Sequence, residues 1–519
     1  MASVLRLLKN TFQKKLATSN NSRKVVWYSL GQEKTKNIAT NSLILIFVQG
    51  VTLCTGIAKA MLFSRTLDKF DYGTYNQGLF VVSFVSPFVA LGLANAVNYF
   101  YNKTEQVNEK QTYVNTIFSM TIILGIFCAL GIIGFRQNIA DYFDNSALFG
   151  LLIYVAFTPL LANIIALYQP LFISNGMAKA IAVRNLIVSL LQLIVLGTIS
   201  IYSHNIALMF IVILTLDLLQ IVIFGGYFNY KCFKIKLLNI SRKYIAPILT
   251  YAVPVALATT VGTISLSIDK MIIGRMMSVE DFALYSNVSK ELPFNIISNS
   301  FTIIITPVII GFFAEKQIDK LKNAWSSYLE IGYLSTWALC CGAIVCSREL
   351  VLFLYTDRYI DGLSIFVVYL FVTMIRFTYF GLILTASGKT KWIFIYSLFS
   401  LVLNLVLSII LFGLLGIMGP SISNLISNSL LAVVMFLHNV KVLKVKTLDV
   451  INIRCMFFFI IQLVCTGLLI YCIDEVIISQ YISVNIVKLI VKYFMFLLIL
   501  FLLCRKRIKT LILELNRIQ

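Results

Sequence analysis

The segment RTLDKFDYGTYNQ, from Arg65 to Gln77, occurs a second time in altered form as RMMSVEDFALYSN, from Arg275 to Asn287. The two segments share Arg, Asp and Tyr at the same spacing: Arg65, Asp71 and Tyr75, then Arg275, Asp281 and Tyr285. A second pair, SNGMAK at 174–179 and ASGKTK at 386–391, is offset by 212 residues, and the first pair by 210. Two matches in nearly one register indicate that the chain contains two copies of one unit.

Each copy of this motif follows one long apolar stretch and opens the next. Of the 519 residues, 59% are hydrophobic and 13% are charged, a composition that a soluble domain cannot bury, so the bilayer is the expected solvent. We predict an all-α integral membrane protein with about 14 transmembrane helices of roughly 20 residues or more. Numbered in chain order, these spans lie near 41–63, 75–100, 112–134, 148–173, 179–202, 205–228, 245–268, 282–311, 326–347, 363–386, 391–413, 416–437, 454–473 and 481–504.

The lysines and arginines predict the orientation. If the N-terminus is cytoplasmic, the loops and tails on that side carry 30 of them and the outward loops carry 7. This bias predicts that both termini are cytoplasmic. The net charge of +21 is then mostly a topology signal, strengthened by attraction to anionic lipids. Because the basic residues are scattered through short loops, we expect no nucleic-acid partner.

The repeat predicts the domain organisation. An even number of spans in each copy gives both copies one orientation, related by a pseudo-twofold axis along the membrane normal. Internally repeated membrane proteins are most often transporters, with their substrate sites near the midplane between the copies. The predicted parts are a basic cytoplasmic tail at 1–40, an N-lobe of spans 1–6 at 41–228, a cytoplasmic linker at 229–243, a C-lobe of spans 7–12 at 244–440, spans 13–14 at 441–504, and a cytoplasmic tail at 505–519.

Charged residues inside the predicted spans are candidates for a substrate site, because each costs roughly 2.5–3.5 kcal/mol on insertion scales. Lys59 and Lys270 lie on polar faces of spans 1 and 7 and match within one residue of the repeat register. They predict positive charge on opposite walls of one cavity, suited to an anion such as a diphosphate. The alternative is that both side chains snorkel to water at the helix ends.

Two further charges lie in the middle of spans. Arg376, in FVTMIRFTYFG, should face the interior and meet a carboxylate or a ligand anion. Its role is either substrate binding or gating, or a structural ion pair. Asp217, in LTLDLLQ, either titrates in a proton- or sodium-coupled cycle or pairs with Arg184 in the neighbouring helix.

Uncharged and charged polar residues also form stripes along spans 1, 2, 7 and 8. Such stripes suit hydrogen bonds to sugar hydroxyls, although small and polar residues are equally the usual contacts between membrane helices. The predicted lining residues are Gln49, Thr52, Asn98, Thr259, Thr263, Asn287, Glu291 and Asn295.

Catalytic machinery is not evident in the sequence. There are two histidines, and no phosphate-binding glycine loop, metal-ligand spacing or nucleophile elbow. We therefore expect a transporter rather than an enzyme, with no catalytic residues, no metal and no cofactor, and with possible coupling to a proton or sodium gradient.

The motifs resemble those of a known family. R-x-L-x-x-x-x-Y-G-x-Y at 65–75, L-G-L-x-x-A-V at 91–97, and SIDKMIIGRMMSVEDFALYSNVSK at 267–290 are similar to segments of the Wzx-type polysaccharide and O-antigen flippases. These flippases are a branch of the multidrug/oligosaccharidyl-lipid/polysaccharide (MOP) exporter superfamily. With the count of spans, the resemblance covers nearly the whole chain. The sequence departs from the pattern with Ala283 in place of Gly and with Lys270 where arginine is common.

The resemblance implies two six-helix lobes around a central cavity, with two C-terminal helices beside them. It implies a flippase that moves polyprenyl-diphosphate-linked oligosaccharides across the bacterial cytoplasmic (inner) membrane by alternating access, for surface polysaccharide or lipopolysaccharide synthesis. Lys59, Lys270 and Arg376 become candidates for binding the diphosphate or acidic sugars. Implied partners are the lipid-linked oligosaccharide, membrane lipids, and possible polysaccharide polymerase and chain-length machinery.

Other functions remain open at this point. A multidrug antiporter is disfavoured because a basic cavity repels cationic drugs. A lipid II flippase differs mainly in the headgroup. A membrane-embedded polymerase or acyltransferase is disfavoured because the sequence has no large external loop and no catalytic histidine.

Overall fold

The computed structural model describes residues 48–478, 480 and 484–518, and every regular element in this part of the chain is a helix. The predicted N-terminal tail at 1–40 and the beginning of span 1 lie outside the described residues. Twelve segments of the described chain are long and apolar enough to cross a membrane. One of them, Thr390–Leu443, contains two helices that are joined near Gly416. The predicted all-helical, multi-span membrane fold is confirmed.

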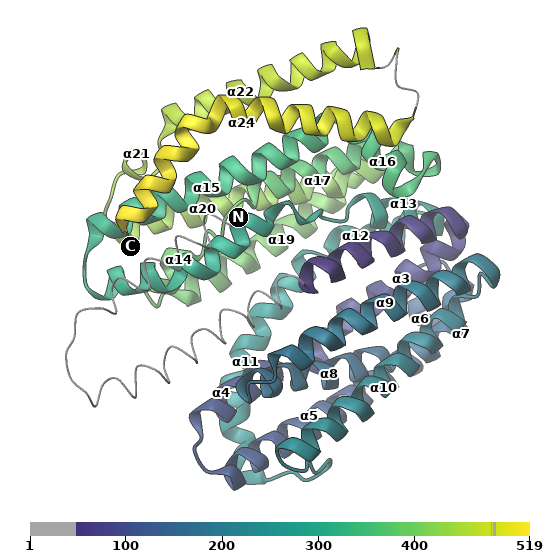
Figure 1. Ribbon diagram of the computed structural model, residues 1–519. Coiled ribbons are helices and arrows are strands. Elements are labelled where there is room, and N and C mark those ends of the chain that lie inside the picture. The colour runs from purple at the N-terminus through teal and green to yellow at the C-terminus, as the bar shows by residue number, and fades with distance from the viewer. Residues whose placement is uncertain (1–47, 479, 481–483, 519) are drawn as a thin grey trace.

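The N-terminal half begins with a helix at 48–66. It continues with α3 (Lys69–Ala90), α4 (Leu93–Lys103), α5 (Val107–Gly134), α6 (Arg136–Tyr142), α7 (Ser146–Val155), α8 (Thr158–Ser174), α9 (Ala178–Tyr202) and α10 (Ile206–Lys231) (Figure 1). Span 2 bends between α3 and α4, where Gly92 has a φ of 67°. A Cβ there would lie 2.5 Å from the carbonyl oxygen of Ala252, so the bend requires glycine.

The C-terminal half repeats this order. It comprises α11 (Arg242–Ser265), α12 (Ile268–Met276), α13 (Val279–Val288), η1 (Pro293–Asn295), α14 (Ile296–Ala314), α15 (Ile318–Val345), α16 (Ser347–Tyr355), η2 (Asp357–Gly362), α17 (Leu363–Ile375), α18 (Leu382–Ala386), α19 (Thr390–Leu415), η3 (Gly416–Met418) and α20 (Gly419–Leu443). The chain ends with α21 (Thr447–Val450), α22 (Ile453–Ile473), η4 (Asp474–Ile478) and α24 (Asn485–Ile518). In Figure 1 the two halves form two separate groups of helices, and α22 and α24 lie along the outer side of the second group.

The repeated motif starts a helix in each half. The backbone N–H of Asp71 donates to Asp68 Oδ1 (2.6 Å) at the start of α3, and that of Asp281 donates to Ser278 Oγ (3.1 Å) at the start of α13. Such a cap satisfies an N–H that has no partner within its helix. The shared tyrosines, Tyr75 and Tyr285, are buried. The motif therefore sets both the beginning of the helix and the residue that it buries.

The two halves meet at the ends of the helices that carry the motif. One apolar cluster contains residues of both halves, including Tyr72 and Phe80 of α3 with Phe282 of α13. The rings of Phe80 and Phe282 lie 6.2 Å apart, edge to face. A Cβ on Gly73 would lie 2.3 Å from the carbonyl oxygen of Val279, so the backbones of α3 and α13 touch here. The predicted orientation places this junction at the outer end.

At the opposite end the apolar clusters are separate. One cluster is built from N-half helices and the first turns of α11, whereas another consists of residues of the C-half and of the segment around α21 that follows it. Helix α11 is the exception to the grouping by halves, because its Tyr251 stacks on Tyr99 of α4 with ring centroids 4.5 Å apart. The halves are therefore joined by α11 and by the junction of α3 with α13, which the predicted orientation makes the outer junction.

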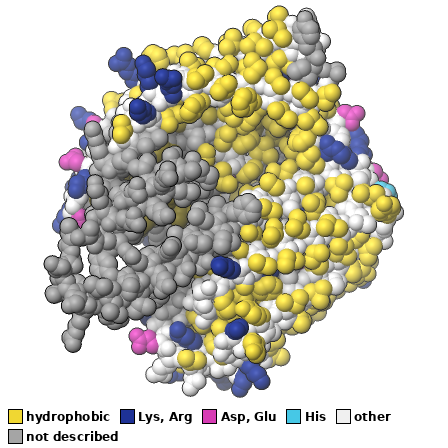
Figure 2. Space-filling view, in the orientation of Figure 1, with side chains coloured by type: hydrophobic (Ala, Val, Ile, Leu, Met, Phe, Trp, Pro, Cys, Tyr) yellow, Lys and Arg dark blue, Asp and Glu magenta, His cyan; other side chains and the backbone are white. Residues whose placement is uncertain are grey.

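The exposed surface is consistent with a lipid environment. Figure 2 shows hydrophobic side chains over most of the described face, with Lys and Arg side chains gathered toward its ends. Large apolar side chains on α19, such as Phe399 and Ile409, are more than half exposed. A bilayer would cover them without cost.

Buried charges attach the last two spans to the C-half. Lys492 of α24 has a side chain that is 5% exposed, and its Nζ lies 2.8 Å from Glu349 of α16 and 2.7 Å from Asp474 of η4. Further along α24, Arg507 contacts both carboxylate oxygens of Glu330 on α15, at 2.6 and 2.7 Å. These two contacts hold α24 along α15 and α16.

Replacing Lys492 with Met should destabilise the protein, because the substitution leaves the buried Glu349 carboxylate without this cation. Removing one member of a buried ion pair costs about 3–5 kcal/mol. The loss should appear as a lower midpoint of thermal unfolding in detergent. Lys506→Met, on the exposed face of the same helix, is the matched control. An unchanged midpoint for Lys492→Met would show that the pair does not hold α24.

Candidate functional site

Three lysines come together where the halves face each other. Lys59 lies on the helix at 48–66, Lys270 on α12, and Lys290 just after the end of α13. Lys290 interacts electrostatically with both Lys270 and Lys59. Its Nζ also lies 5.9 Å from the ring centre of Tyr72, which belongs to the N-half. The sequence predicted Lys59 and Lys270 in one site, and the structure adds Lys290.

The contacts of these lysines are with neutral groups. Lys59 Nζ donates to Gln192 Oε1 (3.0 Å), and Lys290 Nζ donates to Asn287 Oδ1 (3.1 Å). None of the ion pairs found among the described residues contains one of the three lysines. Like charges that share a site repel one another and favour an anion between them.

The position of Lys290 argues against snorkelling for this residue. Helix α13 starts at the outer junction and has 10 residues. At 1.5 Å per residue its end lies about 15 Å deeper, roughly halfway through a hydrocarbon core of about 30 Å. Lys290 is nevertheless solvent-accessible. We therefore expect Lys290 to lie at mid-membrane depth, where the halves face each other.

Two helices are interrupted close to these lysines. Span 8 is broken between α13 and α14, and span 10 is unwound between α17 and α18. Arg376 of the second break forms an ion pair with Glu291 of the first, and their side chains are 35% and 36% exposed. The backbone N–H of Tyr379 donates to the hydroxyl of Tyr328 (2.9 Å). Broken helices are tolerated at membrane depth only where such partners or water are present, and in transporters they mark substrate sites.

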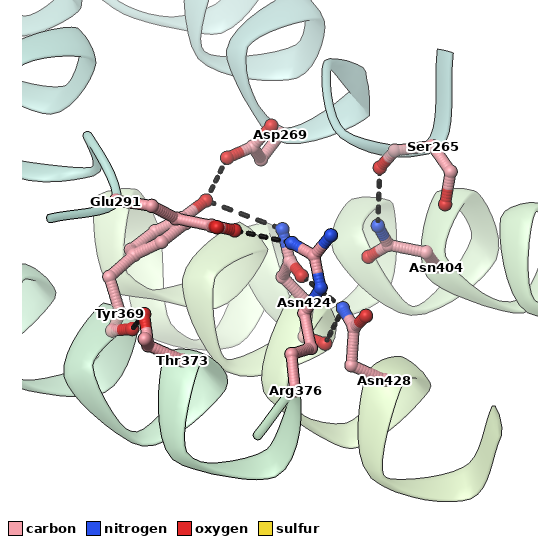
Figure 3. A network of polar contacts seen from close by, with 9 residues as sticks. All are labelled: Ser265, Asp269, Glu291, Tyr369, Thr373, Arg376, Asn404, Asn424 and Asn428. Carbon is pink, nitrogen blue, oxygen red and sulfur yellow. Dashed lines mark hydrogen bonds and ion pairs between the residues drawn. The ribbon is translucent and has the colours of Figure 1, made fainter. Parts of the chain in front are cut away.

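Arg376 thus faces a carboxylate, one of the two partners that the sequence predicted for it. Because both side chains are accessible, the pair is open to exchange with another anion. Figure 3 shows Glu291 and Arg376 pointing toward each other from these two interrupted segments.

A second polar cluster surrounds Asp269 of α12, which is 1% exposed. Its Oδ2 accepts hydrogen bonds from the hydroxyls of Tyr285 (3.1 Å) and Tyr369, and Tyr369 also contacts Asn424 (Figure 3). The other carboxylate oxygen, Oδ1, is buried without a hydrogen-bond partner. A buried carboxylate oxygen without a hydrogen-bond partner can bind a small hard cation.

The two halves differ at this point of the repeat. The offset of 210 that aligns Arg65 with Arg275 also aligns Lys59 with Asp269, so Lys270 is one residue out of register. The offset of 212 aligns Gln192, the partner of Lys59, with Asn404 on α19. The N-half therefore presents a cation where the C-half buries an anion.

The other predicted lining residues are placed unevenly. Asn287, Glu291 and Asn295 all lie at or near the break in span 8. Thr259 and Thr263 of α11 donate to carbonyls of their own helix. Gln49 and Thr52 are exposed on the first helix. Asn98 lies apart from this group, on α4, where it accepts a hydrogen bond from Asn102 (2.9 Å).

Asp217 is buried within the N-half, between α9 and α10. Gln220 Nε2 donates to its Oδ1 (3.0 Å), and Arg184 Nε donates to Gln220 Oε1 (2.9 Å). Asp217 and Arg184 also interact electrostatically, so they lie in one structural cluster that Gln220 bridges, in line with the structural alternative. This contact is separate from the Lys290 and Asp269 clusters.

The sequence analysis singled out Tyr285 for the repeated motif but did not predict a site at Asp269, Tyr369 and Asn424. The polar residues Ser421, Asn424 and Asn428 recur at helical spacing in PSISNLISNS, which could have indicated a polar face on span 12. Tyr369 carries no comparable signal, because a tyrosine in an apolar span is ordinary. In the described part of the chain, no group of three or more His, Cys, Asp or Glu could hold a metal ion.

Comparisons with known proteins agree with this architecture. The chain is 21% identical over 363 residues to the capsular polysaccharide biosynthesis protein CapF of Staphylococcus aureus, covering 69% of this chain and 88% of CapF. The solved structure of the lipid II flippase MurJ, in an inward closed conformation, superposes with a TM-score of 0.70 at 15% identity, covering 90% of this chain and all of that one. An inward-facing multidrug resistance MATE transporter of the MOP superfamily superposes with a TM-score of 0.58 at 14% identity, covering 76% and 94%.

The two superpositions confirm the predicted fold class. At such low sequence identity the superpositions show a shared fold and nothing more. The family is shown by a match of sequence. The model of a family described as "Polysaccharide biosynthesis protein" matches residues 62–364, more than half of the chain. This match confirms the resemblance to polysaccharide exporters. The chain belongs to the polysaccharide biosynthesis protein family and has the fold of the MOP-superfamily transporters.

Proposed function

We propose that this protein is a flippase that moves polyprenyl-diphosphate-linked oligosaccharides from the inner to the outer leaflet of the cytoplasmic membrane. The observation that carries the proposal is the cluster of Lys59, Lys270 and Lys290 between the halves, whose members form none of the ion pairs found in the described part of the chain. A diphosphate that links a lipid to a sugar carries a negative charge on each phosphate. Three lysine ammonium groups within the membrane-spanning part of the chain suit that headgroup.

The broken helices supply the rest of the site. Arg376 lies near the lysines but is held by Glu291, so it can join the headgroup only if the anion displaces this carboxylate. At the break in span 8, the half-buried Asn295 has an amide oxygen without a hydrogen-bond partner, which suits a bond from a sugar hydroxyl. The apolar lipid tail would remain in the bilayer beside the lobes.

The arrangement of the halves suits alternating access. Their outer ends are packed together, while their apolar clusters are separate at the other end. With both termini in the cytoplasm, as the basic residues predict, the lysine cluster would face the inner leaflet in this conformation. The expected partners are the lipid-linked oligosaccharide, membrane lipids, and the polymerase and chain-length machinery that would use the product.

Two alternatives of the same fold make different predictions. A multidrug antiporter for cationic compounds is disfavoured by the three lysines, which repel cations. A lipid II flippase would use the same diphosphate chemistry on another headgroup. The relation to a capsular polysaccharide protein by sequence, rather than by fold alone, favours the oligosaccharide.

Replacing Lys59, Lys270 and Lys290 together with Gln should abolish leaflet transfer of a polyprenyl-diphosphate oligosaccharide in proteoliposomes. Each single variant should reduce transfer roughly tenfold, because each removes one charge-assisted contact with the diphosphate. Lys320→Gln, an exposed residue on α15, is the matched control and should transfer normally.

The same assay distinguishes the alternatives. Full transfer by a correctly inserted triple variant would exclude the lysine cluster as the site. If the wild type transfers lipid II but no other lipid-linked saccharide, the headgroup assignment is wrong. If it transports cationic drugs and no lipid, it is an antiporter.

Glu291→Gln should bind the diphosphate headgroup more tightly, because the substitution removes the carboxylate that competes for Arg376. We expect a gain of roughly tenfold in affinity, equivalent to about 1.4 kcal/mol, measured by titration calorimetry in detergent. Arg376→Gln should weaken binding. The control is Glu280→Gln at the exposed start of α13. If wild type and Glu291→Gln bind the headgroup with equal affinity, the Arg376–Glu291 ion pair has only a structural role.

For energy coupling we propose Asp269 in place of Asp217, because Asp269 is buried in the C-half near the lysines and has one unpartnered carboxylate oxygen. Asp269→Asn should remove the stimulation of transfer by an imposed sodium or proton gradient and leave slow transfer without a gradient. Asp217→Asn should keep the stimulation. The reverse result would place coupling in the N-half, and stimulation retained in both variants would exclude both residues.

A further inference from the structure

The arginines of the repeated motif lie outside the lysine cluster and have no part in binding the proposed substrate. Arg65 ends the helix at 48–66, and Arg275 lies in the last turn of α12. Both side chains are exposed at the junction where the halves meet. Each reaches across to the opposite half.

Arg65 contacts the end of α16 in the C-half. Its Nη2 donates to the carbonyl oxygen of Phe353 (2.6 Å), and its Nη1 donates to those of Leu354 (3.4 Å) and of Met61 in its own helix (2.7 Å). Carbonyls in the last turn of a helix have no partner within it and carry the negative end of the helix dipole. The guanidinium of Arg65 therefore caps a helix of the other half.

Arg275 makes the corresponding contact in the opposite direction. Its Nη1 donates to the carbonyl oxygen of Asp141 (3.1 Å), in the last turn of α6 in the N-half. Its guanidinium also lies 5.8 Å from the ring centre of Tyr142, and the hydroxyl of Tyr142 donates to the carbonyl oxygen of Met271 on α12 (2.9 Å). The same end of α6 is thus held twice by the C-half.

The two contacts are related by the repeat. Helix α6 directly follows α5 in the N-half, and α16 directly follows α15 in the C-half, at an offset of 211 residues from Arg136 to Ser347. Arg65 and Arg275 are offset by 210. Each arginine therefore caps the short outer helix of the other copy, so a single interaction occurs twice about the pseudo-twofold axis.

One further arginine strengthens the Arg65 side. Arg358 of η2 donates to the carbonyl oxygens of Ser64 (2.7 Å), Leu67 (3.3 Å) and Arg65 (3.3 Å), which belong to the N-half. These groups become free when span 1 gives way to α3, so Arg358 satisfies the break between the two helices. The C-half thus contacts this part of the N-half in two ways. It accepts hydrogen bonds from the side chain of Arg65 and donates hydrogen bonds to backbone carbonyls through Arg358.

We propose that Arg65 and Arg275 form a reciprocal latch that holds the predicted outer end of the two halves closed, each by capping a short helix of the opposite half. Release of a substrate to the outside requires the halves to separate at this junction, and both caps are lost when they do. Partially solvated hydrogen bonds to backbone carbonyls have modest net strength, which suits a contact that must form and break in each cycle. The proposal rests on the proposed function and on the predicted orientation.

The test measures the distance between the halves at this end. Spin labels carried by non-natural amino acids at Asn138 on α6 and Asp361 on η2, both exposed, avoid the ten natural cysteines. In proteoliposomes, Arg65→Gln/Arg275→Gln should raise the ratio of separated to closed molecules by roughly tenfold over wild type, the effect of losing a few hydrogen bonds of modest net strength. Each single variant should give a smaller shift.

Two controls separate bonding from charge. Arg136→Gln removes an arginine of the same outer surface that stacks on Phe149 within its own half, and it should leave the distances unchanged. Arg65→Lys/Arg275→Lys keeps the charge, but an ammonium group cannot reproduce the spread donors of a guanidinium. The ratio of separated to closed molecules should still rise in this milder variant. If the Gln variant does not fold, the Lys variant provides the test.

The distances between the two spin labels test the latch without any measurement of transport. An unchanged distribution in a folded double variant overturns the latch, and so does an equal shift in Arg136→Gln. A shift in the double variants supports the latch even if the wild type fails to transfer lipid-linked oligosaccharide, in which case the proposed function alone is wrong. Transfer by the wild type with no shift in the variants would keep the flippase and discard the latch.

Discussion

Hydrocarbon cannot form hydrogen bonds, and most of this structure follows from that constraint. Backbone groups inside the bilayer must be satisfied within helices, so the described chain is a set of helices joined by short turns. Interruptions occur only where other protein groups or water can replace the lost bonds. The break in span 10 meets this condition, since the hydroxyl of Tyr328 accepts from the backbone N–H of Tyr379 and the indole N–H of Trp337 donates to the carbonyl oxygen of Met374. The same constraint therefore shapes the scaffold and locates the site.

The repeat creates two kinds of relation between the halves. At the predicted outer junction the relation between the halves is nearly symmetric. Arg65 and Arg275 cap equivalent helices there, and α3 crosses α13 at their capped ends. Deeper in the membrane it is asymmetric, because Lys59 in one half corresponds to the buried Asp269 in the other. A symmetric contact is suited to opening and closing the molecule, whereas an asymmetric pair allows one half to bind an anion while the other responds to a cation.

Much of the architecture could be predicted from the sequence, because the signals involved are long or repeated. Apolar stretches of about 20 residues identify spans whatever their neighbours are, and the recurrence of RTLDKFDYGTYNQ identified the two halves. Single charged residues in apolar stretches, such as Lys59, Lys270 and Arg376, are conspicuous for the same reason. Lys290 and Asp269 were harder to interpret, since both lie next to another charged residue, and Asp269 directly follows the predicted end of span 7.

Hydropathy and repetition are properties of local segments, so the sequence was enough to predict a multi-span helical membrane protein built from two copies. Which charges meet could be seen only in the folded structure. Glu291 and Arg376 are 85 residues apart, and Arg65 and Phe353 are 288 apart. Tyr369 reaches Asp269 over a separation of 100. Such pairs depend on how helices cross and where they unwind, and these features arise from the packing of side chains between distant segments rather than from the pattern of any one of them.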